Sequence, residues 1–414
     1  MKQSHLFTKT RREAPKDETA KNAELLIRAG YIHKEMAGVY SFLPLGLRVL
    51  NNIVAIIREE MNAIGGQEMY MSALQDKELW SRTDRWDDEK VDNWFKTALK
   101  AGGETGLAIT HEEPLTRIMT DHITSYRDLP VAAYQFQTKF RNELRAKSGI
   151  MRGREFLMKD MYSFSKSEEE HRMFYEEAKA AYLRIFDRVG VGAKTYPTFA
   201  SGGIFSEFSE EFQTVSDAGE DTVYIDEKKN VAVNKEVYND KTLEKLGLIR
   251  EELVEKKAIE VGNIFNLGTR FSTALNLSFL DERGAHQPVI MGSYGLGPSR
   301  LMGTIVEVLA DEKGLLWPKQ IAPFTLHLLE LSGGKMAVRE AAEALYGRVS
   351  ARGVSVLYDD RDASAGAKFA DADLLGIPMR VVVSAKTIAA GGIELTDRKT
   401  GESRMVKEEE LFGL

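Results

Sequence analysis

The segment at residues 140–156 carries side chains suited to nucleotide binding, namely Arg141, Glu143, Arg152 and Phe156. An arginine offers a planar fork of donors to phosphate oxygens. On an extended strand Arg141 and Glu143 project to the same face, so one can bind phosphate while the other accepts from an adenine amino group. Phe156 can stack on the purine ring. The competing interpretation is an ordinary surface hairpin held by salt bridges.

Basic residues are concentrated around this segment, since seven of them lie between residues 139 and 159. Such a run is most often one solvated face of a helix. Here Gly149 and Gly153 interrupt helical continuity. We therefore predict a loop between two strands, with its basic groups converging on an anion.

A second segment, residues 292–300, is rich in glycine and ends at Arg300. Glycines at alternate positions, such as Gly295 and Gly297, let a strand pass close beneath a ligand. Arg300 falls near the start of the next predicted helix, where an anion is favoured. A tight strand-to-helix turn without a ligand would show the same glycines.

Thr110 and Glu112 lie just before Pro114, a residue that suits the first turn of a helix. If the backbone is extended there, both side chains point to one face and could hold a small ammonium or iminium group. The alternative is a capping box between Thr110 and Glu113. For residues 199–203 and 260–265, a buried strand ending in a turn is the simpler interpretation.

Composition excludes several classes of protein. The 414 residues contain 43% hydrophobic and 29% charged residues, and no run of 18 apolar residues that could cross a membrane. There is no cysteine and the seven histidines are scattered, so disulfides, thiolate chemistry and zinc sites are not expected. We expect a cytoplasmic protein without a signal peptide. The net charge of −7 argues against broad nonspecific binding to nucleic acid.

Apolar periodicity predicts the elements that would position these residues. We expect strands at residues 131–140 and 154–164 on either side of the basic loop. Other strands are predicted at 67–72, 260–271, 274–280 and 288–295, and helices at 47–64, 168–189 and 301–310. Residues 82–106 are predicted to be irregular, and the charged residues 216–258 to be a short peripheral segment.

Two prolines within residues 315–323 mark a domain boundary. Beyond it, strands and helices alternate, which is typical of a small α/β domain with a largely parallel sheet. We predict strands at 324–330, 354–358, 381–383 and 393–397, and helices at 336–351 and 368–375. The predicted domains are residues 1–322 and 323–414.

The order of these motifs resembles that of class II aminoacyl-tRNA synthetases, and within them the prolyl-tRNA synthetases. Residues 140–156 resemble motif 2, residues 292–300 motif 3, and residues 47–72 motif 1. Thr110-His111-Glu112 resembles the Thr-x-Glu loop that recognises proline. The resemblance implies an α+β catalytic domain, with a mostly antiparallel sheet flanked by helices, and a C-terminal α/β anticodon-binding domain.

The resemblance also implies a role for each matching residue. Arg141 and Arg300 would be the catalytic residues. ATP would be bound by Arg141, Glu143, Arg152, Phe156, Glu260 and Arg300, with Glu260 beside its Mg²⁺. Proline would be bound by Thr110, Glu112, Arg141, Phe199, Gly202, Gly203, Asn263 and Phe265. The candidates for reading the anticodon are Arg361, Lys368 and Glu394.

The sequence departs from the family pattern in places. Ser72 stands where motif 1 usually has proline, and Asn263 replaces a bacterial histidine. Residues 204–212 lack two glycines and a histidine of the bacterial pattern. Only about 47 residues separate Phe212 from Glu260. That is too few for the inserted editing domain of many relatives at typical domain sizes. We therefore expect the short form, without editing in cis.

The resemblance implies a proline–tRNA ligase that uses ATP with Mg²⁺, L-proline and tRNA(Pro). A homodimer is expected, with no zinc and no other cofactor. The alternatives are a synthetase for another amino acid, a catalytically altered synthetase-like protein that binds tRNA, and a nucleotide-binding protein with a fused α/β module. The Thr-x-Glu loop argues against the first, and the retained arginines argue against the second.

Overall fold

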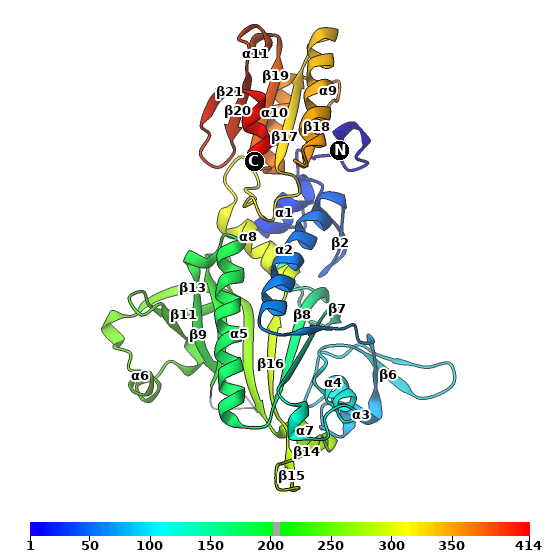
Figure 1. Cartoon of the computed structure of the whole chain (residues 1–414), viewed down its shortest axis with the longest axis vertical. Coiled ribbons are helices and arrows are strands. Elements are labelled where there is room, and N and C mark those ends of the chain that lie inside the picture. The colour runs from blue at the N-terminus through cyan, green and yellow to red at the C-terminus, as the bar shows by residue number, and fades with distance from the viewer. Residues whose placement is uncertain (202–207) are drawn as a thin grey trace. The chain divides into compact units, whose positions relative to one another are not determined.

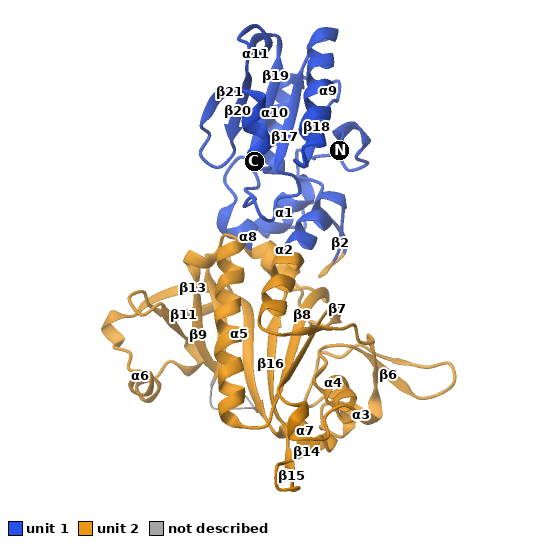
Figure 2. Ribbon diagram, viewed as in Figure 1, with its two compact units in different colours: residues 1–35, 40–53, 305–414 blue, residues 36–39, 54–304 orange. Residues whose placement is uncertain are grey.

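A computed structural model describes residues 1–201 and 208–414. The chain forms two compact units (Figure 2). Unit 1 comprises residues 1–35, 40–53 and 305–414, and unit 2 comprises residues 36–39 and 54–304. Among the described residues, no helix has both the length and the apolar character needed to cross a bilayer.

Unit 2 is built on one large sheet, in the order β10-β9-β12-β11-β13-β16-β8-β7-β3. Most of its pairings are antiparallel, and among the described residues only β3–β7 and β9–β12 are parallel. The strands are β3 (Gln67–Glu68), β7 (Val131–Phe140), β8 (Glu155–Ser165), β9 (Thr195–Ser201), β10 (Phe208–Val215), β11 (Asp221–Asp226), β12 (Val231–Asn234), β13 (Val254–Gly268) and β16 (Ile290–Leu296). The predicted antiparallel class is confirmed.

Strand β13 pairs with β11 along its first half and with β10 along its second half. Since β10 pairs with β9, β9 with β12 and β12 with β11, the pairings close into a ring. Its buried apolar residues include Val223, Ile225, Ala232 and Ala258. Residues 216–258 thus supply β11, β12 and the first residues of β13 to the main sheet, which the sequence analysis did not predict. Charges on the exposed positions concealed their short apolar runs.

Helix α5 (Glu168–Arg188) packs against β8, β13 and β16 (Figure 1). The Ser167 side chain caps its first turn by accepting from the Glu170 amide, and three glutamates there complement the helix dipole. Its sheet-facing residues Ala178, Tyr182 and Phe186 are fully buried. The predicted helix at residues 168–189 is therefore confirmed.

A smaller sheet, in the order β4-β6-β5, stands beside helix α4 (Glu112–Met119). Its elements are β4 (Leu74–Asp76), α3 (Lys77–Ser81), β5 (Lys96–Ala98) and β6 (Glu104–Leu107). Its core contains three tryptophans, Trp80, Trp86 and Trp94. The rings of Trp80 and Trp94 meet edge to face, with their centroids 4.7 Å apart. Residues 82–106 are consequently more ordered than predicted, because aromatic packing supplies what periodicity does not reveal.

Two strand predictions in unit 2 are only partly right. In the predicted strand 67–72 only β3 is regular. Residues 274–280 divide between the end of α7 (Arg270–Leu275) and β14 (Ser278–Leu280), because Asn276 adopts a left-handed conformation that ends the helix. Strand β14 pairs with β15 (His286–Pro288). The remaining elements outside the C-terminal sheet are α1 (Lys21–Arg28), β1 (Ile32–Met36), β2 (Val39–Phe42), α2 (Pro44–Ala63), α6 (Asp240–Leu246) and α8 (Pro298–Leu309).

The C-terminal part of unit 1 is a five-stranded sheet in the order β18-β17-β19-β20-β21. Its elements are β17 (Leu326–Leu331), α9 (Met336–Ala351), β18 (Val356–Asp359), α10 (Ala365–Leu375), β19 (Met379–Ser384), α11 (Ala385–Ala389), β20 (Ile393–Asp397) and β21 (Ser403–Val406). The first three strands in this order are parallel, β20 is antiparallel to β19, and β21 is antiparallel to β20. The predicted α/β class is confirmed, with a mixed sheet.

Candidate active site

The side chain of Arg141, directly after β7, lines three cavities in unit 2. The first, the arginine cavity, also has Arg152 and Arg300 in its lining and a volume of about 250 Å³. The second, the glycine cavity, is lined by glycines that include Gly295 and Gly297 and has a volume of about 50 Å³. The third, the Thr110 cavity, has Thr110 in its lining and a volume of about 290 Å³. Arg300 lines the first two. The fold therefore brings together the two arginine-bearing segments that the sequence analysis singled out.

The Arg141 guanidinium has no hydrogen-bond acceptor or ion-pair partner among the described residues, and its contact is with the ring of Phe156, 5.2 Å from the centroid. Burial and the nearby charge of Arg300 hold the pKa of Arg141 below its ordinary value. A desolvated cation without a directly paired carboxylate is costly, and a bound anion would offset that cost. Arg141 is thus poised for an anionic ligand.

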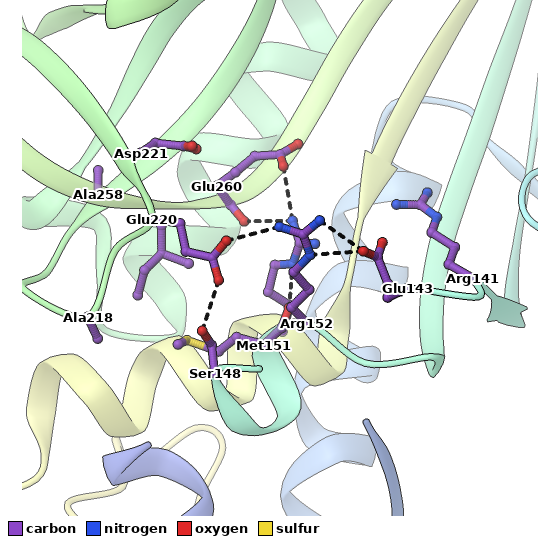
Figure 3. Close-up of a pocket in the computed structure, with 12 residues that line it drawn as sticks. Arg141, Glu143, Ser148, Met151, Arg152, Ala218, Glu220, Asp221, Ala258 and Glu260 are labelled. Atoms are coloured by element: carbon purple, nitrogen blue, oxygen red, sulfur yellow. Dashed lines mark hydrogen bonds and ion pairs between the residues drawn. The ribbon is translucent and has the colours of Figure 1, made fainter. Parts of the chain in front are cut away.

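Arg152 lies between two carboxylates in the arginine cavity (Figure 3). Its guanidinium is 2.9 Å from Glu143 and 3.0 Å from Glu220. Glu220 also accepts a 2.9 Å hydrogen bond from the Ser148 hydroxyl. These carboxylates occupy the donors of the Arg152 guanidinium, a fork that can bind carboxylate or phosphate oxygens. Glu220 belongs to the segment expected to be peripheral, so the sequence analysis missed it.

Glu220 is placed by a close backbone approach at Gly219. A β-carbon at residue 219 would lie 2.3 Å from the carbonyl oxygen of Ala258 on β13. Real β-carbons do not approach so near, so only glycine permits this turn. The turn between β10 and β11 therefore holds Glu220 against the arginine cavity.

Arg300 lies in the first turn of α8 and is fixed by three acceptors. It donates to the carbonyl oxygen of Met151 at 2.8 Å, and to the side chain and backbone carbonyl of Glu260 at 3.0 and 3.1 Å. Asn263 donates to the other Glu260 oxygen at 2.9 Å. The asparagine that replaces a family histidine thus positions Glu260.

Three carboxylates are crowded beside the arginine cavity. Burial and the charge of Glu260 raise the pKa of Glu211 to about 8, and burial raises the pKa of Asp221. Since like charges disfavour ionisation, this corner favours a proton or a bound cation. No group of three potential metal ligands converges in the part of the chain that is described. Mg²⁺ nevertheless needs only one or two carboxylates when phosphates supply other ligands, so the residues present fit it.

The Thr110 cavity is lined by the predicted proline-binding residues Thr110, Glu112, Asn263 and Phe265. The Thr110 hydroxyl donates to Glu112 at 2.7 Å. The residue that caps α4 is His111, which makes no side-chain cap bond. The alternative of a capping box between Thr110 and Glu113 is therefore wrong, and both polar groups remain at the cavity.

Glu112 is held by charge as well as by Thr110. Arg85 lies 3.2 Å from Glu112 and 3.0 Å from Glu113. Burial raises the pKa of Glu113 to about 7, although the Arg85 charge opposes the rise. The hydroxyl of Ser293, on β16, donates to Glu112 at 3.4 Å. Arg85 and Ser293 were not predicted as site residues, and Arg85 lies in the stretch expected to be irregular.

A buried polar cluster that includes Asp160 and Tyr162 adjoins the Thr110 cavity. The Lys139 ammonium lies 2.8 Å from Asp160, and the Tyr162 hydroxyl donates to Asp160 at 3.1 Å. The same hydroxyl accepts from the His111 amide at 3.0 Å. Burial, with the charge of Lys139, lowers the pKa of His111 to about 4, so this imidazole is neutral at pH 7. Every member of this cluster is thereby fixed relative to Thr110.

Two other groups of predicted residues lie elsewhere. Phe199 is on β9 and does not line any of these three cavities, and Gly202 and Gly203 fall outside the described residues. In unit 1, Lys368 is 2% exposed and its ammonium donates to the carbonyl oxygens of Glu330 and Asp359. Such burial favours a structural role for Lys368.

The other two anticodon candidates are more accessible than Lys368. Arg361 is half-buried and pairs with Asp359 at 2.7 Å and Asp371 at 2.8 Å. Glu394 lies in β20 and is also half-buried. Arg361 would have to exchange a carboxylate partner in order to contact RNA.

Comparisons with known proteins point to one family. Residues 95–309 match the model of the tRNA synthetase class II core domain (G, H, P, S and T), and residues 326–414 match the anticodon binding domain. A proline–tRNA ligase of Hyphomonas neptunium is 38% identical over 440 positions, covering 100% of this chain and 99% of that protein. One of Nitrobacter winogradskyi is 40% identical, covering 99% and 98%.

A longer relative and a solved structure agree. A proline–tRNA ligase of Bacillus velezensis is 34% identical over 561 positions, covering 99% of both chains, so it contains residues without a counterpart here. The structure of Giardia lamblia prolyl-tRNA synthetase in complex with prolyl-adenylate has a TM-score of 0.75 at 18% identity. It covers 94% of this chain and 74% of that one, which shows a shared fold. The chain therefore belongs to the prolyl-tRNA synthetases, in their short form, within the class II aminoacyl-tRNA synthetases.

Proposed function

We propose that this proline–tRNA ligase activates L-proline with ATP at the cavities around Arg141 and transfers the prolyl group to the 3′ end of tRNA(Pro). The position of Arg141 is the observation that carries this proposal. Its guanidinium lines both the arginine cavity and the Thr110 cavity, and it has no ion-pair partner among the described residues. An α-phosphate joined to a prolyl carboxyl group would lie at such a junction.

In the first step a carboxylate oxygen of proline attacks the α-phosphorus of ATP. A new P–O bond forms, the bond to the β-phosphate oxygen breaks, and pyrophosphate leaves. The protein forms no covalent bond, so catalysis rests on positioning and on stabilising charge. Arg141 is proposed to bind the α-phosphate, and Arg152 and Arg300 the end of the triphosphate.

Adenine recognition is assigned to Glu143 and Phe156. Glu143 would accept from the adenine amino group, and Phe156 would stack on the ring with Arg300 on the opposite face. In the free protein Glu143 is paired with Arg152. ATP binding therefore requires Arg152 to exchange its carboxylate partners for phosphate oxygens, which leaves Glu143 available to the base.

The imino group of proline is assigned to Thr110 and Glu112. Secondary ammonium nitrogen carries two protons, which a hydroxyl oxygen and a carboxylate can accept. Phe265 and Asn263 line the same cavity and would limit its size around the pyrrolidine ring. Phe199, Gly202 and Gly203 remain proposed contributors to that pocket.

Mg²⁺ is proposed to accompany the nucleotide beside Glu260, with Glu211 and Asp221 close by. When bound, it would neutralise phosphate charge as pyrophosphate develops. Asn263 and Arg300 each donate a hydrogen bond to one carboxylate oxygen of Glu260, which fixes the position of this side chain. Burial and the charge of Glu260 raise the pKa of Glu211 to about 8, and a cation beside Glu260 would oppose that rise.

In the second step a ribose hydroxyl of the terminal adenosine attacks the prolyl carbonyl carbon. The bond to the phosphate oxygen breaks, AMP leaves, and the hydroxyl proton is released. Unit 1 would select the tRNA through its anticodon, with Arg361, Glu394 and the buried Lys368 as the proposed contributors. A cytoplasmic homodimer is proposed as the working form.

Proline-dependent exchange of pyrophosphate into ATP tests this function directly. The purified protein should catalyse exchange with proline and not with threonine, serine, glycine or histidine, and should charge tRNA(Pro). Exchange that depends on another amino acid would contradict the assignment to proline. The absence of any exchange, with tRNA binding intact, would favour a catalytically altered protein.

A further inference from the structure

Unit 1 contains a basic cavity of about 480 Å³ that the proposed reaction does not use. It is lined by the arm at residues 10–12, the end of α1, the loop after α8 and one face of α10. Its basic side chains are Arg11, Arg12, Arg28 and Lys313. At roughly 30 Å³ per water molecule, the cavity has room for a hydrated phosphate group.

Three of these cations are free to bind an anion. Arg11, Arg12 and Lys313 are exposed, and no carboxylate among the described residues lies within ion-pair distance of them. Arg28 is half-buried, and its contact with Glu24 is long at 3.5 Å. Its buried Nε atom has no hydrogen-bond partner in the described part of the chain. The arginines and the lysine thus present unused donors around one space.

The acidic residues in the wall do not cancel this charge. Asp371 pairs with Arg361 at 2.8 Å, and Asp373 pairs with Arg380 at 2.8 Å. Both arginines lie outside the set that lines the cavity. Each wall carboxylate thus has an arginine partner outside the cavity, although Arg361 is shared with Asp359, and the four basic side chains of the lining outnumber these two carboxylates.

The arm that carries two of the cations is held in place. The Arg11 amide donates to the carbonyl oxygen of Arg28 at 2.7 Å, and the Thr10 hydroxyl donates to Asp371 at 2.7 Å. Binding an anion would consequently require little ordering of the backbone. Preorganised donors lose less entropy on binding than donors on a mobile arm.

We propose that the basic cavity binds a backbone phosphate of the tRNA, which rests on the function proposed above. A net charge of −7 means that the protein does not attract RNA indiscriminately, so a local basic site has to supply the contact. One wall is α10, within the residues 326–414 that match the anticodon-binding model. Arginine forks and an ammonium suit phosphate oxygens, and such contacts carry no base specificity.

The test uses the full-length protein with Arg11 and Arg12 both changed to glutamine. We expect the KM for tRNA(Pro) in aminoacylation to rise roughly fivefold to twentyfold at moderate salt. The log–log salt slope of tRNA binding should fall by about 0.7 to 0.9, which corresponds to the loss of one phosphate contact. Lys313→Gln should change both in the same direction by a smaller amount. Proline-dependent pyrophosphate exchange should stay unchanged.

The matched control is Arg348→Gln with Arg404→Gln, which removes two exposed arginines of unit 1 that are paired with Glu408 and Glu410. Arg11→Lys with Arg12→Lys should retain most of the affinity. An unchanged KM and salt slope in the Arg11/Arg12 variant, with exchange intact, would overturn the proposal. Equally, inorganic phosphate that binds this cavity while tRNA binding is indifferent to the substitutions would assign it to a free anion. Loss of proline-dependent exchange in the unmodified protein would instead refute the proposed function.

Discussion

A carboxylate oxygen of Glu220 lies 3.0 Å from the guanidinium of Arg152, the side chain that is proposed to bind the end of the triphosphate. Glu220→Gln removes the negative charge and leaves a similar shape. We expect the KM for ATP in pyrophosphate exchange to fall about twofold to fivefold, because an exposed ion pair is worth up to about 1 kcal/mol. Glu227→Gln, in the turn after β11, is the control. A higher KM would show that Glu220 assists nucleotide binding.

Arg141 is the side chain on which the proposed chemistry depends most. Arg141→Ala should lower the rate of pyrophosphate exchange by about two to three orders of magnitude, at 1.36 kcal/mol per tenfold. Arg141→Lys should recover only part of that loss, because an ammonium lacks the planar fork. Arg145→Ala, in the exposed loop nearby, should be close to normal. Near-normal exchange in Arg141→Ala would rule out the proposed role.

Thr110 should matter for proline and not for ATP. Thr110→Val keeps the shape of the side chain but loses the hydroxyl that contacts Glu112 and Tyr162. We expect the KM for proline to rise about tenfold, which corresponds to about one hydrogen bond. The KM for ATP should stay within about twofold. Thr120→Val, after α4, serves as the control. Equal changes in both constants would indicate a general distortion of the site.

Lys159 on β8 gives a prediction about pH. Burial lowers the pKa of Lys159 from 10.5 to about 7, and its ammonium contacts Tyr182 and Tyr294. Between pH 7 and 10.5 the unfolded chain binds one more proton here than the folded chain does. This group therefore makes stability increase with pH across that window, by up to about 1.4 kcal/mol per unit.

Lys159→Met should remove that dependence. The melting temperature of the unmodified protein, measured relative to the variant at each pH, should rise from pH 7 to pH 10. Lys166→Met, just beyond β8, should track the unmodified protein. A difference that is flat or falls with pH would mean that Lys159 stays charged in the folded protein.

Local patterns predicted the parts of the fold in which one period dominates. Strand β7 and helix α9 begin and end where the sequence predicted, because each has clear periodicity and a clear stop. The ring of strands was missed, since β11 and β12 are short and lie among charges. Their burial depends on pairing with β9 and β13, which are distant in the chain.

The same distinction applies to the candidate site. Arg141, Glu143, Arg152 and Arg300 could be found because their types and spacing suit phosphate and adenine. Arg85 and Glu220 could not, because each reaches the cavities from a different segment and carries no local signal. Ser293 lies within the glycine-rich segment, but a lone serine there does not indicate a contact with Glu112. Only the folded chain shows that Glu220 pairs with Arg152, which is proposed to bind phosphate. The sequence therefore identifies the arginine donors, and the fold identifies the carboxylates that pair with them.

The glycine turn at residue 219 has a consequence for engineering nucleotide affinity. A library that varies Glu220 alone can retune competition at Arg152 without disturbing the scaffold. Replacing Gly219 would drive its new side chain into the Ala258 backbone and move the neighbouring carboxylate at the same time. Directed evolution of this enzyme should accordingly diversify one position of the pair and hold the other constant.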